Sequence, residues 1–585
     1  MVPRSTTSAM LIVIIAAIVA YGQIIKFELG RFDEDGMIRG NIKILKDSAT
    51  ISDVVQQDPF FRKPGLNFYR PAQNISLWMD VKLGKGKAST FHWTNLLLHV
   101  LTCVVVLRLL NVVTTDKLTS TLLAVVFAVN PLFAQAIAWV PGRGDLIVGL
   151  CSAAFLHAIL RDPEISRTRT VITTVAATAI AIFAKETSIL FPAILVLFVL
   201  ARGSRGTLLS RNFLIVLLGS AASAGLYLWA RSVVVTKTTQ GNQFGLEPLL
   251  YNLRVIPEVV AKFVLPIGLQ PMASYSILPT VVGICVIGAL GYLIWRITDT
   301  ESRMLAVLGA VWFVVFMLPG AMFIHADGVA AYDYLEHRAY LPIIGLLIPA
   351  ALVFSTNSNR LAWGTVHKIL GVLCIGYLVV TLIHVQNYAT PLSFYDKAVS
   401  ANPTSSLAHT NRGLLRENRG DIAGALEDYT DAIEANPAFA QAYVNRGNRY
   451  GAAGDKERAK DDYIKAIQYK PWLFPARYNL GNYYLDTRQL DKAYEQYKAA
   501  ADLNPTFTQT HALLGVTASL MGNNLAAETH LNEALRLNPG NAQNLVTRGR
   551  IRFAMQNYQG ARSDWQQSSA LGNAEASTLL NQIPQ

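Results

Sequence analysis

Three acidic side chains follow one another at residues 33–35, just beyond the first long apolar run of the chain. Asp33, Glu34 and Asp35 come a few residues after the apolar run 9–25. Such a run is long enough to cross a bilayer. Carboxylates are costly to desolvate there, at about 2.5–3.5 kcal/mol each near the bilayer centre. A carboxylate facing a lipid-borne substrate could act as a general base, whereas a solvated acidic loop would do no chemistry.

Basic side chains that could hold a phosphate recur near the ends of later apolar runs. Arginine binds phosphate oxygens in a bidentate fashion, and lysine supplies a point charge. The candidate segments are Tyr69-Arg70-Pro71, Gly142-Arg143-Gly144-Asp145, Lys185-Glu186 and Glu336-His337-Arg338-Ala339-Tyr340. The first three have a structural alternative: Arg70 as a membrane-flanking anchor, an Arg143–Asp145 ion pair, and pairing of Lys185 with Glu186 at bilayer depth.

Eleven apolar runs of spanning length must position these side chains. With the N-terminus inside, the inner loops carry an excess of arginine and lysine, in agreement with the positive-inside rule. The acidic cluster, Arg143, Lys185 and Arg338 then share the outer face with the large loop 26–90 and the C-terminal part of the chain. The runs are 9–25, 93–112, 119–138, 144–160, 169–183, 187–200, 212–230, 279–296, 303–324, 340–355 and 366–385.

Two segments leave the topology open to other interpretations. Residues 248–270 are apolar but contain Arg254, Glu258 and Lys262. We interpret them as a re-entrant or surface-lying amphipathic helix, because a further span would invert every later loop. Residues 1–25 resemble a cleaved signal peptide, but an uncleaved anchor is the simpler interpretation.

Composition separates a membrane part from a water-soluble part. Of 585 residues, 52% are hydrophobic and 15% charged, against about 25% charged in soluble domains. The apolar character ends near Val385. We therefore expect an all-α protein, with a multi-pass membrane domain at 1–388 and a soluble domain at 389–585.

The net charge of +12 is accounted for by the basic loops and implies no nucleic acid. The four cysteines lie within apolar runs, which predicts neither a disulfide nor a thiol metal site.

The soluble domain repeats with a period of 34 residues. This spacing, with glycine and alanine where paired helices meet and proline after the second helix, is the tetratricopeptide pattern. It predicts five helix pairs with terminal capping helices in a solenoid that has a concave groove. The repeating residues are Pro403, Pro437, Pro471, Pro505 and Pro539; Gly413, Gly447, Gly481, Gly515 and Gly549; Ala425, Ala459, Ala493, Ala527 and Ala561; and Tyr429, Tyr463, Tyr497 and Trp565, with Leu531 in the fourth repeat.

Asparagines recur at one register of the first helices. Asn411, Asn445 and Asn479 could form a ladder of amides that hydrogen-bond an extended peptide. Alternatively, these side chains merely solvate the groove, because Leu513 and Thr547 interrupt the ladder.

Taken in order, the motifs resemble a known family. The pieces are Phe-Asp-Glu at 32–34, Tyr-Arg-Pro at 69–71, Phe-His-x-x-Asn-x-x-x-His at 91–99, Asn-Pro…Gly-Arg-x-Asp at 130–145, Lys-Glu at 185–186 and Glu-x-Arg-x-Tyr-Leu-Pro at 336–342. Together with the repeats, they resemble the transmembrane and tetratricopeptide-repeat O-mannosyltransferases and their bacterial relatives, within the GT-C membrane glycosyltransferases. The chain departs from that family's pattern at Ala72, Asn130 and Gln135.

The resemblance implies an enzyme of the membrane. It would move a sugar, mannose or another hexose, from a polyprenyl-phosphate carrier to a protein hydroxyl on the non-cytosolic face. For a bacterial member, this means the inner membrane, with a cytoplasmic N-terminus and periplasmic repeats that recruit the acceptor. No metal is expected, although the acidic cluster could bind Mg²⁺ or Mn²⁺.

Site roles follow from the same resemblance. Asp33 would be the base and Glu34 would position it or hold the acceptor. Arg338 and Arg143 would bind the phosphate, together with Lys185 or Arg70. The remaining substrate-binding candidates are Asp35, Tyr69, His92, His99, Asp145, Glu186, Glu336 and Tyr340.

Other functions fit the same sequence. The acceptor could be a glycan or lipid, with the repeats recruiting a partner enzyme. The protein could also be a non-catalytic scaffold that works through its repeats. A transporter is disfavoured because inverted halves and mid-span acids are not evident.

Overall fold

The computed structural model describes residues 6–30, 37–56, 68–202, 206–235, 243–244, 246–272, 276–324, 335–356 and 363–583. Its internal contacts divide the chain into two compact units, Met1–Ala401 and Asn402–Gln585. The acidic cluster Asp33, Glu34 and Asp35 lies outside the described residues. The role of this cluster therefore stays a prediction. The predicted domain boundary at residues 388–389 also stays a prediction.

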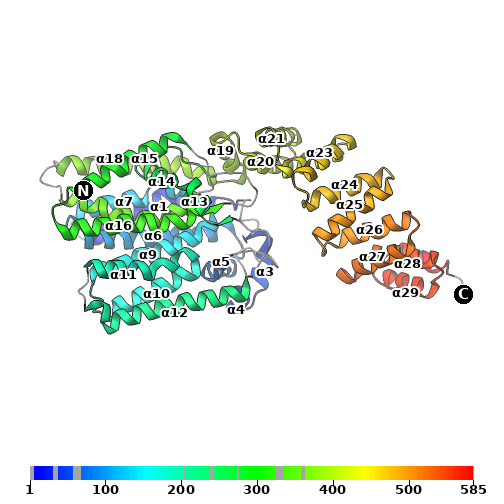
Figure 1. Ribbon diagram of the computed structural model, residues 1–585, viewed down its shortest axis with the longest axis horizontal. Helices are drawn as coiled ribbons and strands as arrows, with labels where there is room; N and C mark the ends of the chain where they lie inside the picture. The colour runs from blue at the N-terminus through cyan, green and yellow to red at the C-terminus, as the bar shows by residue number, and fades with distance from the viewer. Residues whose placement is uncertain are drawn as a thin grey trace. The chain divides into compact units, whose positions relative to one another are not determined.

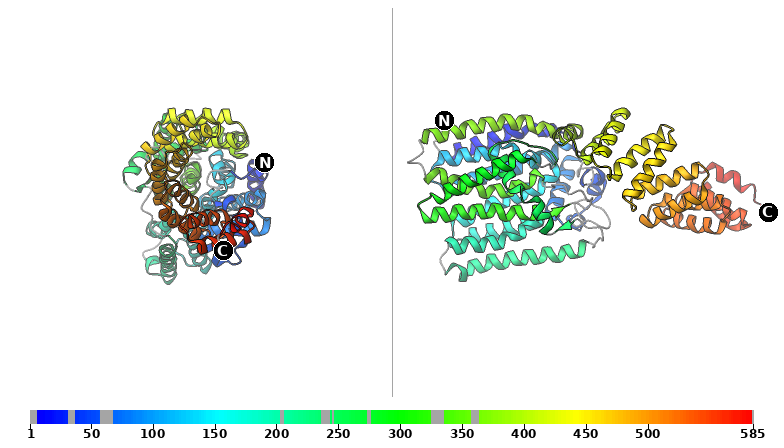
Figure 2. Two further views of the ribbon diagram at one scale, coloured as in Figure 1. Left: turned by 90° about the vertical axis from the view of Figure 1, so that its right-hand side faces the viewer. Right: turned by 45° about the horizontal axis from the view of Figure 1, so that its top comes forward.

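Eight long apolar helices make up most of the first unit, with their axes nearly parallel (Figures 1 and 2). Among the described residues, these eight are long and apolar enough to cross a membrane. The first unit is accordingly that of a multi-pass membrane protein. The helices are α1 (Thr6–Tyr21), α6 (Ala88–Val113), α9 (Arg143–Arg161), α12 (Arg211–Val234), α15 (Ile277–Trp295), α16 (Thr300–Ala321), α17 (Tyr340–Thr356) and α18 (Trp363–His384).

Three of the eleven predicted spans form shorter or bent elements. Helix α7 (Lys117–Ala128) and the segment Pro131–Ala138 are bent by 40° and form either a broken span or a re-entrant loop. The break falls at Pro131, which has no N–H to continue a helix. Helix α10 (Thr168–Ala184) has 17 residues and α11 (Phe191–Arg202) has 12. The part of the chain that the structure describes thus holds eight candidate spans, or up to nine with the bent pair.

The segment interpreted as non-spanning forms two short helices, α13 (Leu246–Asn252) and α14 (Val255–Val264). Neither passes as a candidate span. Instead, α14 is tethered to its neighbours by polar contacts: Asn130 Nδ2 and Tyr377 Oη each donate to the Phe263 carbonyl at 3.0 Å. These contacts hold α14 against α18 and the loop after α7.

Shorter elements complete the first unit. The strands β1 (Gln243–Phe244) and β2 (Phe323–Ile324) pair antiparallel. The remaining α-helices are α3 (Ile42–Asp47), α4 (Ile51–Val55), α5 (Pro71–Gly84), α8 (Ala134–Ala138) and α19 (Pro391–Ala401). The 3₁₀ turns are η1 (Gly22–Lys26), η2 (Arg39–Asn41), η3 (Pro131–Phe133), η4 (Val140–Gly142), η5 (Glu186–Leu190), η6 (Thr207–Leu209), η7 (Glu336–Ala339) and η8 (Val385–Tyr388).

Small residues bring α16 and α17 into backbone contact. A Cβ added at Gly309 would lie 2.6 Å from the Gly345 carbonyl oxygen, and one added at Gly345 would lie 2.7 Å from the Gly309 oxygen. Close approach at small residues is a common way to pack membrane helices, because apolar lipid supplies no hydrophobic force between them. All four cysteines are free thiols.

The second unit consists of five stacked helix pairs and a final short helix, α30 (Ala574–Leu580) (Figure 2). In each pair, the periodic glycine faces the large residue 16 positions later: a Cβ at Gly413 would lie 2.6 Å from the Tyr429 ring, and one at Gly549 2.3 Å from Trp565. The pairs are α20 (Ser406–Asn418) with α21 (Ile422–Ala435), α22 (Ala440–Ala452) with α23 (Lys456–Tyr469), α24 (Phe474–Asp486) with α25 (Leu490–Leu503), α26 (Thr508–Leu520) with α27 (Asn524–Leu537), and α28 (Ala542–Ala554) with α29 (Tyr558–Ala570).

Candidate functional site

Two ion pairs lie where α9 begins and α10 ends. Lys185 Nζ donates to Asp145 Oδ1 at 2.6 Å. Arg70 donates from Nε and Nη2 to the two carboxylate oxygens of Glu186, at 3.1 and 2.7 Å. Lys185 and Glu186, neighbours in sequence, therefore pair with other segments of the chain and not with each other. The bidentate geometry fixes the orientation of the Arg70 guanidinium.

These cations are partly accessible. The side chains of Arg70 and Lys185 are 20% and 12% exposed. Burial raises the pKa of Glu186, but the Arg70 guanidinium outweighs burial and lowers this pKa below its usual range. Both members of the Arg70–Glu186 pair are therefore charged at neutral pH, and the cations lie where a negatively charged ligand could reach them.

Arg143 is in a different environment, because it is fully buried. Its Nη1 lies 2.6 Å from Asp80 Oδ2. Its Nε donates to Asn95 Oδ1, and its Nη2 to the Phe91 carbonyl, both at 2.8 Å. The Arg143–Asp145 pair considered as an alternative is thus replaced by Arg143–Asp80 and Lys185–Asp145. The guanidinium joins α5, α6 and α9.

The turn η7 carries Glu336, His337 and Arg338 to the same end of the helices. Lys262 Nζ and the Gln270 backbone N–H donate to Glu336 Oε1, at 3.0 and 3.1 Å. Glu336 is 4% exposed and the Lys262 side chain 6%, so this ion pair is buried. It anchors η7 to α14 and to the loop that follows.

His337 and Arg338 point from η7 toward α9 and α16. The His337 backbone N–H donates to Gln135 Oε1 at 3.1 Å, and its Nε2 lies 3.8 Å from Asp145 Oδ2. Arg338 is partly buried and donates from Nη1 to the Gly320 carbonyl at 3.2 Å. Arg70 and Arg338 both act electrostatically on Lys185. Lys185 pairs with the buried carboxylate of Asp145, and Arg70 interacts electrostatically with that carboxylate. We call Arg70, Lys185 and Arg338 together the cluster around Asp145.

Four predicted substrate-binding residues lie within the helix packing. His99 Nδ1 is 2.8 Å from Tyr340 Oη, and its Nε2 is 3.0 Å from the Ala128 carbonyl. Both residues are fully buried, while Tyr69 is 2% and His92 1% exposed. The Tyr69 ring packs against Tyr227, with the ring centroids 5.8 Å apart. These four side chains line the interior next to the ion pairs and do not project from the surface.

Sequence reasoning missed three residues that hold this region together: Asp80, Lys262 and Gln135. Asp80 lies inside α5 between apolar neighbours, and a carboxylate in such a position predicts a buried cation partner. From the sequence, Lys262 indicates only that its segment does not span the membrane, and Gln135 is only a departure from the family's pattern. In the structure, Gln135 accepts from the His337 N–H of η7 and donates to the Pro271 carbonyl at 2.8 Å.

In the repeats, two of the three ladder asparagines bond within the array. Asn445 Oδ1 accepts from Gln441 Nε2 at 3.0 Å, and Asn479 Nδ2 donates to Asn448 Oδ1 at 2.7 Å. Asn411 is partly buried. Their role in holding a peptide stays a prediction.

The arginines that follow this register form ion pairs within their own repeats. Arg412, Arg446 and Arg548 pair with the aspartates 16 positions later, Asp428, Asp462 and Asp564. Repeats one, two and five thus each have an arginine–aspartate ion pair between their two helices. Leu480 and Leu514 occupy the same register in repeats three and four.

One group of described residues could hold a metal ion: His409, Asp428 and Asp431. His409 Nδ1 lies 3.6 Å from Asp428 and 3.5 Å from Asp431. However, Asp428 already accepts from Arg412 and lies 3.2 Å from Arg416. The arginines balance its charge, so the cluster is explained without an ion.

Comparison with known proteins identifies the second unit. A family model described as "Tetratricopeptide repeat" matches residues 440–471 and 474–507. The C-terminal unit is a tetratricopeptide-repeat array. The predicted period is therefore confirmed, in an all-α chain whose other unit is rich in apolar spans.

Two curated relatives match a part of the chain. Protein O-mannosyl-transferase TMTC3 of Mus musculus is 29% identical over 168 residues, which cover 27% of this chain and 18% of that protein. Its Homo sapiens counterpart is 28% identical over 133 residues, covering 22% of this chain and 14% of that protein. The chain thus spans less than a fifth of the length of either relative.

Solved structures match the repeats. A tetratricopeptide-repeat protein described as having an unusual peptide-binding site, YrrB, is 20% identical and covers 32% of this chain and 98% of its own, with a TM-score of 0.30. A crystal structure of MamA is 19% identical and covers 28% of this chain and 96% of its own, with a TM-score of 0.27.

Proposed function

We propose that this chain is a membrane glycosyltransferase that moves a hexose, mannose in the first instance, from a polyprenyl-phosphate carrier to a hydroxyl of a protein acceptor. The observation that carries the proposal is that Arg70 and Arg338 both act on Lys185, which pairs with Asp145, at one end of the apolar helices. A lipid-phosphate donor must place its phosphate at the end of a membrane helix bundle, and such a cluster supplies the charge to hold it. The partial similarity to two O-mannosyl-transferases supports the same reaction.

The burial of Arg143 is our reason for leaving this residue out of the proposed donor site. Arg143 is fully buried and its donors are engaged by Asp80, Asn95 and Phe91. We therefore assign the phosphate to Arg338, Arg70 and Lys185. As sugar leaves the carrier, negative charge grows on the phosphate, and preorganised cations stabilise that charge most in the transition state.

Asp33 is proposed as the base that accepts the proton of the acceptor hydroxyl, with Glu34 beside it. The hydroxyl oxygen then bonds to the anomeric carbon while the bond from that carbon to the phosphate oxygen breaks. In this proposal, reaction takes place on the non-cytosolic face, and the repeats recruit the acceptor. In a bacterium, the enzyme would lie in the inner membrane with periplasmic repeats.

The test measures transfer of radiolabelled mannose from polyprenyl-phosphate-mannose to protein in membranes containing the full-length chain. Asp33→Asn should lose about 100-fold or more of the activity, within the range of general-base catalysis. Asp35→Asn is the matched control, because it removes a neighbouring carboxylate and should keep most of the activity. Full activity of Asp33→Asn at normal expression would contradict the base assignment.

Arg338→Gln tests the phosphate site. It should raise the KM for the lipid donor and lower kcat. The reason is that a cation on the phosphate stabilises both the bound donor and the transition state, in which the negative charge grows. Lys368→Gln, a substitution in α18, controls for a general loss of positive charge.

If the label appears on glycan or lipid and not on protein, the acceptor part of the proposal is wrong. Equal activity with and without a chelator is expected, since the proposed chemistry uses no metal.

A further inference from the structure

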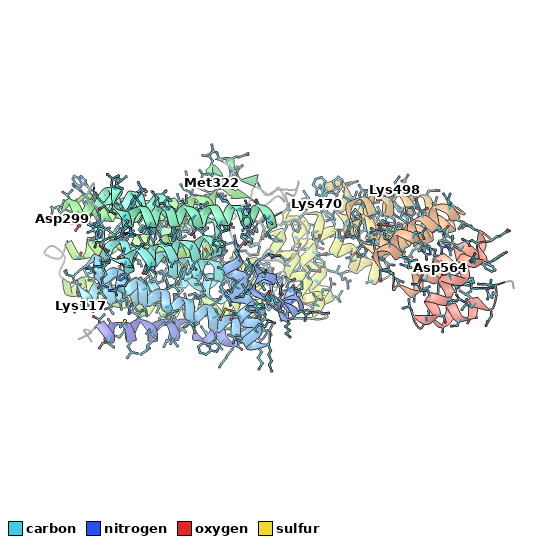
Figure 3. All side chains as sticks on the ribbon, turned by 90° about the horizontal axis from the view of Figure 1, so that it is seen from below. Lys117, Asp299, Met322, Lys470, Lys498 and Asp564 are labelled. Carbon is cyan, nitrogen blue, oxygen red and sulfur yellow. The ribbon has the colours of Figure 1, made fainter. Side chains whose placement is uncertain are left out.

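A groove lies between α15 and α16, near the end of the first unit where α16 begins. It has a volume of about 570 Å³, and every side chain that lines it is apolar except Arg303. Gly291 and Trp295 line it from α15, and Ala310 and Val314 from α16. Asp299, which precedes α16, and Met322, which follows it, lie in different parts of the unit along its length (Figure 3). Arg303, near the start of α16, therefore lies toward the opposite end of this helix from Gly320, which accepts from Arg338.

The groove exists because its two walls pack against other helices. A Cβ at Gly283 of α15 would lie 1.8 Å from the Pro257 carbonyl oxygen, so α15 is in backbone contact with α14. Helix α16 is in backbone contact with α17 through Gly309 and Gly345. Near Gly291, by contrast, an added Cβ would meet no atom within 4 Å. The space beside Gly291 is therefore open.

A positive charge marks one end of the groove. Two acidic side chains close to Arg303 in sequence are engaged elsewhere: Asp299 accepts from the Ser302 N–H at 2.8 Å, and Glu301 pairs with Arg202. In the part of the chain that the structure describes, no carboxylate pairs with Arg303. Trp295 is 68% exposed at the same end. An exposed tryptophan beside an arginine is typical of the membrane–water interface.

The dimensions of the groove match one leaflet. Its α16 wall runs from Arg303 to Val315, which is about 18 Å at about 1.5 Å per residue. One leaflet is half of a hydrocarbon core about 30 Å thick, or about 15 Å.

We propose that this groove binds one acyl chain of an anionic glycerophospholipid, whose phosphate pairs with Arg303. The apolar walls exclude any polar occupant, because an unpaired polar group in such a space costs several kcal/mol. Arg303 selects for an anionic headgroup. The site does not depend on the proposed transferase reaction, because it shares no residue with the cluster around Asp145.

The test is native mass spectrometry of the full-length protein in detergent, with phosphatidylglycerol or phosphatidylcholine added at equal concentration. The wild-type chain should retain one phosphatidylglycerol at least fivefold more often than one phosphatidylcholine. Gly291→Leu should fill the groove and remove this retention. Gly288→Leu is the matched control, since a Cβ there also meets open space but Gly288 does not line the groove.

Charge is tested separately. Arg303→Gln should abolish the preference for phosphatidylglycerol, whereas Arg296→Gln, which removes an arginine that bonds Tyr292 Oη at 3.1 Å, should keep it. Unchanged retention in Gly291→Leu would overturn the groove as the site. Loss of a dimer in Gly291→Leu would instead assign the groove to a second copy of the chain. Displacement of phosphatidylglycerol by a lower concentration of undecaprenyl phosphate would overturn the assignment to a glycerophospholipid.

Discussion

At the scale of single residues, the charges of the first unit fall into two classes. Arg143 and Lys262 are buried with their acidic partners, Asp80 and Glu336. Arg70, Lys185 and Arg338 are partly accessible. Breaking a buried ion pair is costly because it strands one charge, whereas an exposed pair contributes little. The two classes therefore predict different consequences of substitution.

Asp80→Asn should destabilise the first unit by about 3–5 kcal/mol, because it leaves the buried Arg143 guanidinium without its counter-charge. The measurement is the thermal midpoint of the detergent-solubilised protein, followed by tryptophan fluorescence. Arg536→Ala is the comparison: its pair with Glu533 is exposed, and its loss should leave the thermal midpoint almost unchanged. Equal midpoints for both variants would show that the Arg143–Asp80 pair contributes no stability.

His409 predicts a pH dependence in the first repeat. The Asp428 carboxylate, 3.6 Å from Nδ1, raises the pKa of His409 above its usual 6.5, and Asp431 adds to this effect. A raised pKa means that the stabilisation is complete below pH 6.5 and is lost as the pH rises through the higher value in the folded protein. Hydrogen exchange of α20 and α21 should therefore be faster at pH 8 than at pH 6, after correction for intrinsic exchange.

His409→Gln is the control for that effect. A glutamine fills similar space without titrating, so the difference in exchange between the two pH values should vanish. Arg412 and Arg416 also act on Asp428, but they keep their charge over this range. An unchanged pH dependence in His409→Gln would assign the effect to another group.

At the scale of elements, contact between α16 and α17 depends on glycine. Gly309→Ala would force its Cβ to within 2.6 Å of a backbone oxygen, and backbone cannot move aside as a flexible side chain can. We expect a loss of about 1–3 kcal/mol, the usual cost of overpacking. Gly371→Ala in α18 is the matched control, since its Cβ would meet open space. It should be neutral or stabilising by up to about 1 kcal/mol.

The measurement is again the thermal midpoint in detergent. A lower midpoint for Gly309→Ala, with Gly371→Ala unchanged or higher, would support backbone contact between the two helices. The same midpoint for both would show that α16 and α17 do not meet so closely.

At the scale of the whole molecule, the two units predict where the chain can be cut. Helix α18 belongs to the first unit through Thr381, which donates to the Val129 carbonyl at 2.6 Å, and through Tyr377, which donates to Phe263. A chain ending at Ala401 should remain monodisperse in detergent by size-exclusion chromatography. A chain ending at Gly376 loses both contacts and should aggregate. Aggregation of the longer chain would mean that the first unit requires the repeats.

Sequence alone predicted what depends on local pattern. The 34-residue period defined the helix pairs because each repeat is built from nearby residues, and apolar run length predicted the eight long helices. The ion pairs could not be predicted, because their partners lie far apart in sequence: Arg70 and Glu186 are separated by 116 positions. Hydropathy also could not distinguish a straight span from the bent pair at Pro131.

The buried Arg143 has a consequence for biosynthesis. Its three main partners, Asp80, Phe91 and Asn95, all precede it in the chain. A ribosome therefore completes α5 and the start of α6 before the arginine emerges, and the charge enters a membrane in which its partners are already present. For Lys262 the order of synthesis is reversed, because its partner Glu336 is made later. The buried Lys262–Glu336 ion pair can therefore form only after residue 336 has been synthesised, whereas the partners of Arg143 are present from the start.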